Sequence, residues 1–227
     1  MRRLTEKNRL ILTLIVNGVI LLSVAIIAAI GMCQGAGEGQ VGSAVIGLGY
    51  LKPYTMDSNL LAGISSLIIV ICTVRNLVAG KDTTPNWAVT FSLMASACLL
   101  LTMVVAACFL APMRVMMGQS YFSMFSGDMF FFHFLNPILS AFSFTVLLRT
   151  RCYCRRDCLW GMIPTIIYSF VYLAMVVFLH RWEDFYNFTF GGRYQFVPLV
   201  FLVIYALVLL MSLFLVYFHN RTVKTAE

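Results

Sequence analysis

Two clusters of polar side chains interrupt a sequence that is otherwise strongly apolar, and their residue types are those of a nucleophilic hydrolase. They are Thr55, Ser58 and Asn59 in the first cluster, and His133, Asn136 and Ser140 in the second. A hydroxyl beside an imidazole is the minimum for nucleophilic acyl transfer, because the imidazole takes the hydroxyl proton while a third polar group holds the ring. The six residues are therefore candidates for catalysis and for binding or orienting a substrate.

The first cluster has helical spacing. At positions i, i+3, i+4 and i+7 on one helix face lie Thr55, Ser58, Asn59 and Ala62. A purely structural interpretation is also available, in which Thr55 caps the helix after Pro53 and Asp57 is favourable in the first turn. From spacing alone this structural interpretation is the better supported of the two.

The second cluster surrounds the single histidine that lies well inside an apolar run. Asn136 and Ser140 follow His133 at i+3 and i+7, which predicts a polar stripe that faces the bundle rather than lipid. Pro137 has no N–H to donate to the carbonyl of His133, so a kink is expected there. A structural histidine bonded to a neighbouring helix explains these residues equally well.

The elements that position both clusters are membrane spans. Of the 227 residues, 61% are hydrophobic and 11% are charged, which excludes a soluble globule, a disordered chain and a coiled coil. About 20 apolar residues cross ~30 Å of hydrocarbon as a helix. Residues 1–227 are thus predicted to form one all-α domain, a polytopic bundle of six transmembrane helices. The spans are expected near 9–33, 55–79, 86–111, 129–149, 160–180 and 195–219.

Most of the 16 Lys and Arg residues fall before span 1 or after spans 2, 4 and 6. By the positive-inside rule, both termini are predicted to be cytoplasmic. The net charge of +7 is then an orientation signal that also contacts anionic lipid heads, and nucleic acid is not an expected partner. Spans 2 and 4 both enter from the outer side, so Thr55 and His133 are expected at similar depths and able to meet.

Three further features carry weaker signals. Cys152, Cys154 and Cys158 share a basic inner loop; zinc binding is the less favoured interpretation, because zinc sites usually pair C-x2-C units, and reduced thiols are preferred. No metal or other cofactor is expected, and no G-x-S-x-G, P-loop or H-E-x-x-H motif is present. Residues 112–127 are rich in Met and aromatic residues, which predicts a short amphipathic segment at the outer interface beside the histidine.

Several short motifs together resemble a known family. They are Tyr54-Thr55-x-x-Ser58-Asn59, His133-x3-Pro137, and Pro164-x3-Tyr168-Ser169 with Tyr172, followed by Trp182 to Phe188. The chain resembles a divergent member of the family of androgen-induced protein and androgen-dependent tissue-factor-pathway-inhibitor-regulating protein. This resemblance implies a six-helix hydrolase that cleaves fatty acid esters of hydroxy fatty acids, with its threonine nucleophile at Thr55 and its histidine at His133. The chain departs from the family pattern just before Thr55 and just after His133, at Leu51-Lys52-Pro53-Tyr54 and Phe134-Leu135-Asn136.

The function favoured by the sequence is therefore hydrolysis of acyl esters taken from the membrane, with Thr55 as nucleophile and His133 as base and then acid. Asn136, Ser58 or Asn59 is expected to orient the imidazole or to donate to the oxyanion. The alternative is a non-catalytic lipid-binding or small-solute transport bundle whose polar stripes line a pathway. The expected location is the plasma membrane or, in a bacterium, the inner membrane. The acyl length and the oligomeric state are left open.

Overall fold

The fold was analysed in a computed structural model, which describes residues 5–33 and 51–224. In these ranges, six helices are long and apolar enough to cross a membrane. They run Glu6–Gly31, Tyr54–Ala79, Asn86–Met116, Asp128–Leu147, Arg155–Phe178 and Tyr194–Lys224. Each predicted span overlaps one of them, with ends that differ by at most five residues. The predicted fold class is confirmed.

Short π-helical and 3-10 segments divide several spans into consecutive elements. Those of the first three spans are α1 (Glu6–Cys33), α2 (Tyr54–Ala79), α3 (Asn86–Val105), the π-helix η2 (Ala106–Leu110) and α4 (Ala111–Met116). The 3-10 helix η3 (Tyr121–Phe125) leads to span 4, which comprises α5 (Asp128–Phe130), the π-helix η4 (Phe131–Leu135), α6 (Asn136–Phe142) and the π-helix η5 (Ser143–Leu147). Span 5 comprises the 3-10 helix η6 (Arg155–Met162), α7 (Ile163–Leu173) and the π-helix η7 (Ala174–Phe178). Span 6 comprises the 3-10 helix η8 (Tyr194–Phe196) and α8 (Val197–Lys224).

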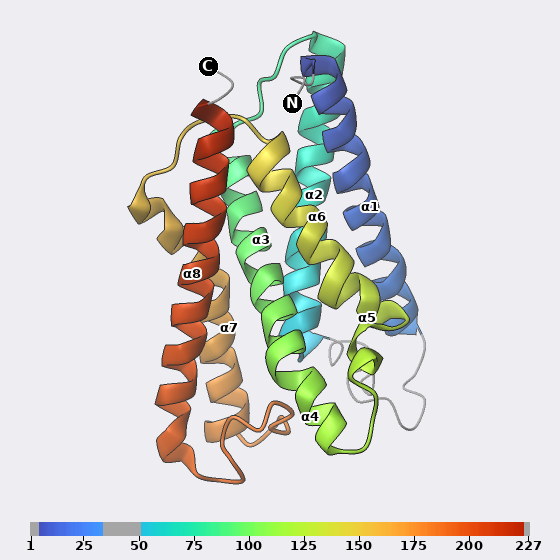
Figure 1. The fold of residues 1–227 in the computed structure, drawn as a ribbon. Coiled ribbons are helices and arrows are strands. Elements are labelled where there is room, and N and C mark those ends of the chain that lie inside the picture. The colour runs from blue at the N-terminus through green and yellow to red at the C-terminus, as the bar shows by residue number, and fades with distance from the viewer. Residues whose placement is uncertain (1–4, 34–50, 225–227) are drawn as a thin grey trace.

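The third span is the centre of the bundle. Figure 1 shows α1 and α2 on one side of α3, and α7 and α8 on the other, while α6 packs on both α3 and α1. Close approach depends on small residues, as at Gly161, where an added Cβ would lie 2.0 Å from the Ser212 hydroxyl oxygen and 3.1 Å from Ala97 Cβ. Helices in lipid associate through such close packing rather than through a hydrophobic driving force.

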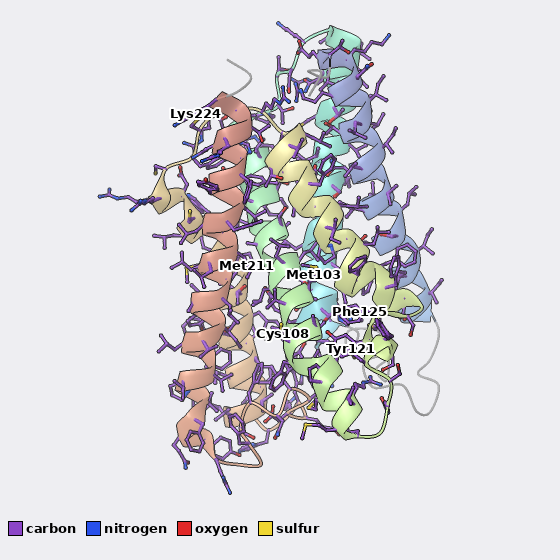
Figure 2. The ribbon with its side chains drawn as sticks, in the orientation of Figure 1. Met103, Cys108, Tyr121, Phe125, Met211 and Lys224 are labelled. Carbon is purple, nitrogen blue, oxygen red and sulfur yellow. The ribbon has the colours of Figure 1, made fainter. Side chains whose placement is uncertain are left out.

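The outer surface of the bundle is apolar. Large exposed side chains on it include Leu22, Ile71, Ile167, Phe170, Leu202 and Leu210. Side chains project outward along all the helices in Figure 2. A continuous apolar surface of this kind is a liability in water but is the normal face of a helix in hydrocarbon.

The two described ends of the chain lie at the same end of the bundle, which we call the inner end (Figure 1). Lys224 marks the inner end in Figure 2, whereas Tyr121 and Phe125 lie toward the opposite, outer end. An even number of spans returns the chain to the side from which it started. The assignment of the inner end to the cytoplasm stays a prediction from the distribution of Lys and Arg.

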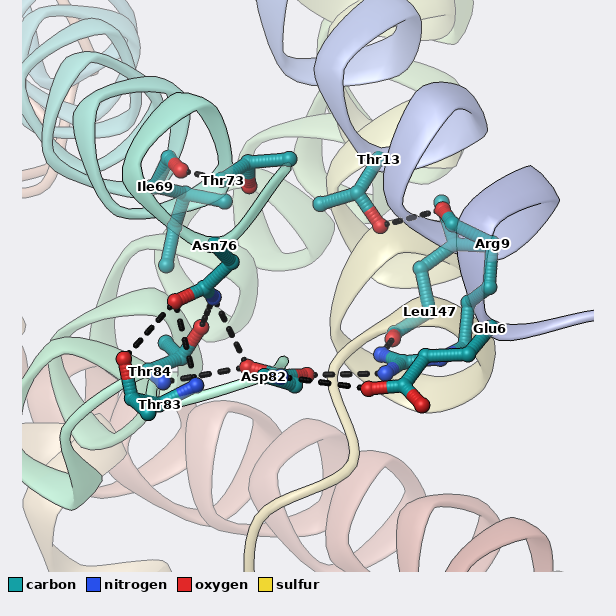
Figure 3. Close-up of polar contacts among 10 residues, drawn as sticks. All are labelled: Glu6, Arg9, Thr13, Ile69, Thr73, Asn76, Asp82, Thr83, Thr84 and Leu147. Carbon is teal, nitrogen blue, oxygen red and sulfur yellow. Dashed lines mark hydrogen bonds and ion pairs between the residues drawn. The ribbon is translucent and has the colours of Figure 1, made fainter. Parts of the chain in front are cut away.

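At the inner end of the bundle, a network of hydrogen bonds and an ion pair connects several helices (Figure 3). The buried guanidinium of Arg9 lies 2.8 Å from Asp82 Oδ2 and donates to the Leu147 carbonyl at 2.6 Å. Asn76 Nδ2 donates to Asp82 Oδ1 at 2.8 Å, and the Asp82 N–H donates to Glu6 Oε1 at 3.1 Å. These contacts join α1 to the turn between α2 and α3 and to the end of η5. We call this group of residues the inner network.

Candidate functional site

Thr55 lies at the outer end of α2 with its side chain directed into the bundle. The helix begins at Tyr54, directly after Pro53, whose extended backbone has φ −74° and ψ 135° and whose side chain makes no capping hydrogen bond. Thr55 is thus already the second helical residue, so the interpretation of its hydroxyl as the helix cap is wrong. The Thr55 hydroxyl oxygen instead lies 3.4 Å from His133 Nε2.

His133 is oriented by a backbone carbonyl. Its Nδ1 lies 2.8 Å from the carbonyl oxygen of Met124, at the end of η3. Because a carbonyl can only accept, Nδ1 carries the proton, and Nε2 of the neutral ring is an acceptor that faces the Thr55 hydroxyl. The Phe125 ring also meets the imidazole edge-on, with centroids 6.4 Å apart. The segment between α4 and α5 therefore holds the imidazole from the outer side.

The helix that carries His133 is locally widened. The π-helix η4 covers Phe131–Leu135 and ends directly before Asn136 and Pro137. Pro137 has no N–H for the carbonyl four residues earlier, so the disturbance expected from the sequence takes the form of a π-turn. Such turns rotate the residues that follow and are frequent at functional sites. After this turn, the buried Asn136 finds its partners on α1 and α2, and the buried Ser140 finds its partner on α3.

A chain of amide hydrogen bonds lies beneath the Thr55–His133 pair. Asn59 Nδ2 donates to the carbonyl of Thr55 at 2.8 Å and to that of Phe132 at 3.4 Å. Asn136 Nδ2 donates to Asn59 Oδ1 at 3.0 Å, and the Ser23 hydroxyl donates to Asn136 Oδ1 at 2.9 Å. The two asparagines thereby tie together the backbones that carry the threonine and the histidine, and they anchor both to α1.

The two serines predicted at the site contact α3. The Ser58 hydroxyl donates to the Thr55 carbonyl at 3.1 Å and lies 2.9 Å from Thr102 Oγ1. The Ser140 hydroxyl lies 2.7 Å from that of Ser96. The hydrogen bonds of these serines and of the asparagines thus go to one another, to α1 and α3, and to backbone carbonyls. The group that orients the imidazole is the Met124 carbonyl, which sequence reasoning missed because every residue has a carbonyl.

Thr55 borders a small cavity of about 50 Å³ on the side of α7 and α8. Its walls are mainly apolar, with hydroxyl groups at Thr55, Thr102, Thr165, Tyr168, Ser169, Tyr186 and the neighbouring Tyr54. His133 is not among the residues that line it. Thr55 therefore contacts the His133 imidazole and also borders the cavity.

Tyr186 brings a second hydroxyl to the start of α2. Its oxygen accepts from the Tyr54 N–H at 2.8 Å, and burial raises the pKa of its phenol to about 12, so it stays protonated at neutral pH. The loop that carries it is folded around Asp184, which accepts from the N–H of Thr189 at 2.7 Å and from its hydroxyl at 2.6 Å. The sequence signal that linked this loop to the site is the Trp182 to Phe188 part of the family resemblance.

The cysteine triplet shows no arrangement for a metal. Cys152 and Cys154 are exposed, whereas Cys158 is buried in the apolar core between α3 and α8. In residues 5–33 and 51–224, no group of three or more His, Cys, Asp or Glu side chains is placed to hold a metal ion. The zinc interpretation therefore gains no support from the described residues.

The arrangement as a whole suits acyl transfer. A threonine hydroxyl faces the acceptor nitrogen of a neutral, oriented imidazole, and the same threonine borders a cavity with apolar walls and a protonated phenol. Chemically, these groups are of the types that could serve as a nucleophile, a base and an oxyanion donor in acyl transfer. No protein-family model, curated protein or solved structure matches this chain.

Proposed function

We propose that this protein is a membrane acyl-ester hydrolase in which Thr55 is the nucleophile and His133 is the general base and then the general acid. The observation that carries the proposal is the 3.4 Å approach of Thr55 Oγ1 to His133 Nε2, with Nδ1 fixed by the Met124 carbonyl. A working contact is shorter, about 2.6–3.2 Å, but such contacts are often long without substrate and tighten when it binds.

The proposed reaction has two halves. Thr55 Oγ1 bonds to the acyl carbon while its proton passes to His133 Nε2; the bond to the alcohol oxygen then breaks, and His133 returns the proton to the departing alcohol. Water next attacks the acyl-threonine, again giving a proton to His133. The acyl–threonine bond breaks, the carboxylic acid leaves, and Thr55 regains its proton. Only hydroxyl, imidazole and water take part, so the reaction needs no cofactor.

We assign the oxyanion to the Tyr186 hydroxyl. This phenol lies on the cavity wall at the start of α2, where its oxygen accepts the Tyr54 N–H, and its O–H is the group that would donate to the substrate oxygen. The N-terminus of a helix also favours negative charge, because its first N–H groups have no partners within the helix. Negative charge that develops on the substrate oxygen would therefore be stabilised by both the phenol and the helix end.

The proposed substrate is a long-chain acyl ester held in the membrane. Thr55 is the second residue of its span, so it lies close to the outer end of the helix. Even two helical turns of depth, at ~1.5 Å per residue, would place it at most ~10 Å below the headgroups. This depth suits an ester group near the headgroups with its chain in hydrocarbon, and the apolar cavity walls suit the chain. Within this class, the family resemblance favours fatty acid esters of hydroxy fatty acids.

The test is a series of nitrophenyl esters from acetate to palmitate, assayed on the purified protein in detergent with substrate solubility controlled. We expect hydrolysis that rises with acyl length, is lost in Thr55→Ala and is partly kept in Thr55→Ser, which preserves the hydroxyl. A fluorophosphonate probe should label Thr55, as mapped by mass spectrometry. Full activity in Thr55→Ala, or a Thr55-dependent rate that is greatest for acetate, would overturn the proposal.

A lipid-binding role without catalysis is the second candidate, and one observation favours it: His133 does not line the cavity. A bundle of this kind would hold an acyl chain beside Thr55 and release it unchanged. The measurement that separates the two is the release of free acid from a bound long-chain ester. Binding without release by the wild-type protein would favour this second role.

Transport is not proposed. The polar side chains of Asn59 and Asn136, which could have lined a pathway, form hydrogen bonds that join the helices to one another.

A further inference from the structure

A second apolar space lies on the surface of the bundle between the last two spans. It is a groove of about 450 Å³ toward the outer end. Leu173 and Val177 line it on one side, and Tyr194, Pro198, Phe201 and Leu202 line it on the other. The side chains around it, such as Phe170 and Leu199, are large, apolar and exposed. Because this face of the bundle meets hydrocarbon, the groove is open to acyl chains of the surrounding lipid.

The length of the groove matches one leaflet. Along the last span it extends from Tyr194 to Tyr205, about 16 Å at ~1.5 Å per residue, which is close to half of the ~30 Å hydrocarbon core. Tyr194 is exposed at its outer end, where aromatic side chains commonly mark the depth of the headgroups. An acyl chain of an outer-leaflet lipid, which lies along the membrane normal, would fit this groove lengthwise.

One buried side chain, Phe201, lines both the groove and the cavity beside Thr55. Its ring stands 5.9 Å from that of Phe188, which lines the cavity, and 6.1 Å from that of Tyr205, which lines the groove. Phe201 therefore lies where the two spaces approach each other.

We propose that this groove is the site where the acyl chain of the lipid ester binds, and that Phe201 is the gate between the groove and Thr55. The inference rests on the proposed hydrolase function and adds the route by which the substrate arrives. The chain settles in the groove from the side, within the leaflet, and its ester group passes Phe201 to reach the cavity. Substrate then never leaves the hydrocarbon, which removes the need to carry a long chain through water.

A binding test that does not depend on catalysis uses a palmitoyl ester with a diazirine in its chain, added to the Thr55→Ala protein in nanodiscs. After illumination, mass spectrometry maps the labelled residues. We expect labelling of groove residues that saturates and is competed by unlabelled palmitate ester. Leu202→Trp, which fills the groove, should reduce this labelling at least fivefold. The matched control Leu210→Trp changes an exposed leucine on the same helix outside the groove, and it should have no effect.

A turnover test in the wild-type background then examines the gate. Leu202→Trp should lower hydrolysis of the palmitate ester about tenfold and leave hydrolysis of the acetate ester within twofold. Phe201→Ala should raise the relative rate on the longest chains, and Phe201→Leu provides the same comparison if the alanine variant does not fold. Labelling that is unsaturable and equal on all lipid-facing helices, with Thr55-dependent hydrolysis intact, would overturn the entry route alone. Saturable labelling without any Thr55-dependent hydrolysis would instead overturn the proposed function.

Discussion

The inner network and the Thr55–His133 pair are both polar clusters inside an apolar bundle, but they are built differently. The inner network is charged and tightly bonded: Arg9 and Asp82 meet at 2.8 Å, and each also bonds to further groups. The outer pair is neutral and loose, with 3.4 Å between the Thr55 hydroxyl oxygen and His133 Nε2 and a cavity beside the threonine. Buried polar groups with full sets of partners hold helices together, whereas the looser pair beside the cavity has the arrangement on which the proposed chemistry depends.

The outer cluster contains both kinds of group in separate layers. The amides of Asn59 and Asn136 bond to each other, to Ser23 and to backbone carbonyls, so they resemble the inner network in function. Above this layer, Thr55 and His133 are held through their backbones and the Met124 contact, and Thr55 borders the cavity. Mutations should therefore separate activity from stability, as follows.

The largest expected effect is on catalysis in the outer pair. His133→Ala should lower kcat for a long-chain ester by ~10³-fold, because general-base catalysis contributes roughly 10²–10⁴-fold and the nucleophile depends on it. The thermal midpoint in detergent should stay close to that of the wild type. A His133→Ala protein that fails to fold, rather than folding without activity, would support the structural interpretation of this histidine.

The inner network should show the opposite pattern. Arg9→Ala should destabilise the protein by ~3–5 kcal/mol, since it leaves the Asp82 carboxylate without its buried partner. Activity per folded molecule should be unchanged. Arg75→Ala is the matched control, because Arg75 is exposed at the same end, and its effect should stay within about 0.5 kcal/mol. Unfolding followed by denaturant titration in mixed micelles checks both values. Equal losses in the two variants would mean that charge at the inner end matters, rather than this ion pair.

A smaller effect is expected at the cavity wall. Tyr186→Phe should lower kcat by ~10²-fold, the usual loss for one oxyanion donor, with KM little changed. It should cost about 1–3 kcal/mol of stability, because the Tyr54 N–H loses its acceptor. Steady-state kinetics with palmitate and butyrate esters give both parameters. A rise in KM with no change in kcat would assign this phenol to substrate binding instead.

The smallest effect concerns pH. Burial raises the pKa of Asp82, but hydrogen bonds from Arg9 and Thr84 outweigh it and keep that pKa below its usual value. A lowered folded pKa stabilises the protein above the unfolded value of about 4, and this stability is lost as pH falls through the folded pKa. The stability difference between wild type and Asp82→Asn should thus be constant near neutral pH and shrink below about pH 4. A difference that does not change down to pH 3 would contradict the role of the carboxylate charge.

The sequence alone determined the spans, because hydrocarbon requires about 20 apolar residues per helix and leaves few alternatives. The parity of the spans also led to the expectation that Thr55 and His133 share a depth, and the structure places Thr55 Oγ1 3.4 Å from His133 Nε2. The first result depends only on the apolar composition of each segment. The second depends only on the side of the membrane from which each span begins.

Only the tertiary structure decided how the pair is surrounded. The π-turn at Phe131–Leu135 changes which residues follow His133 around the helix, so the stripe expected from regular spacing finds its partners on α1, α2 and α3. The Met124 carbonyl orients the imidazole and has no signature in the sequence, since all residues carry the same group. Tyr186 reaches α2 from a loop 132 residues away in the chain. Contacts of this kind depend on how the helices pack side by side. In lipid this packing follows from the fit between the side chains of neighbouring helices, and the sequence of one helix by itself does not specify that fit.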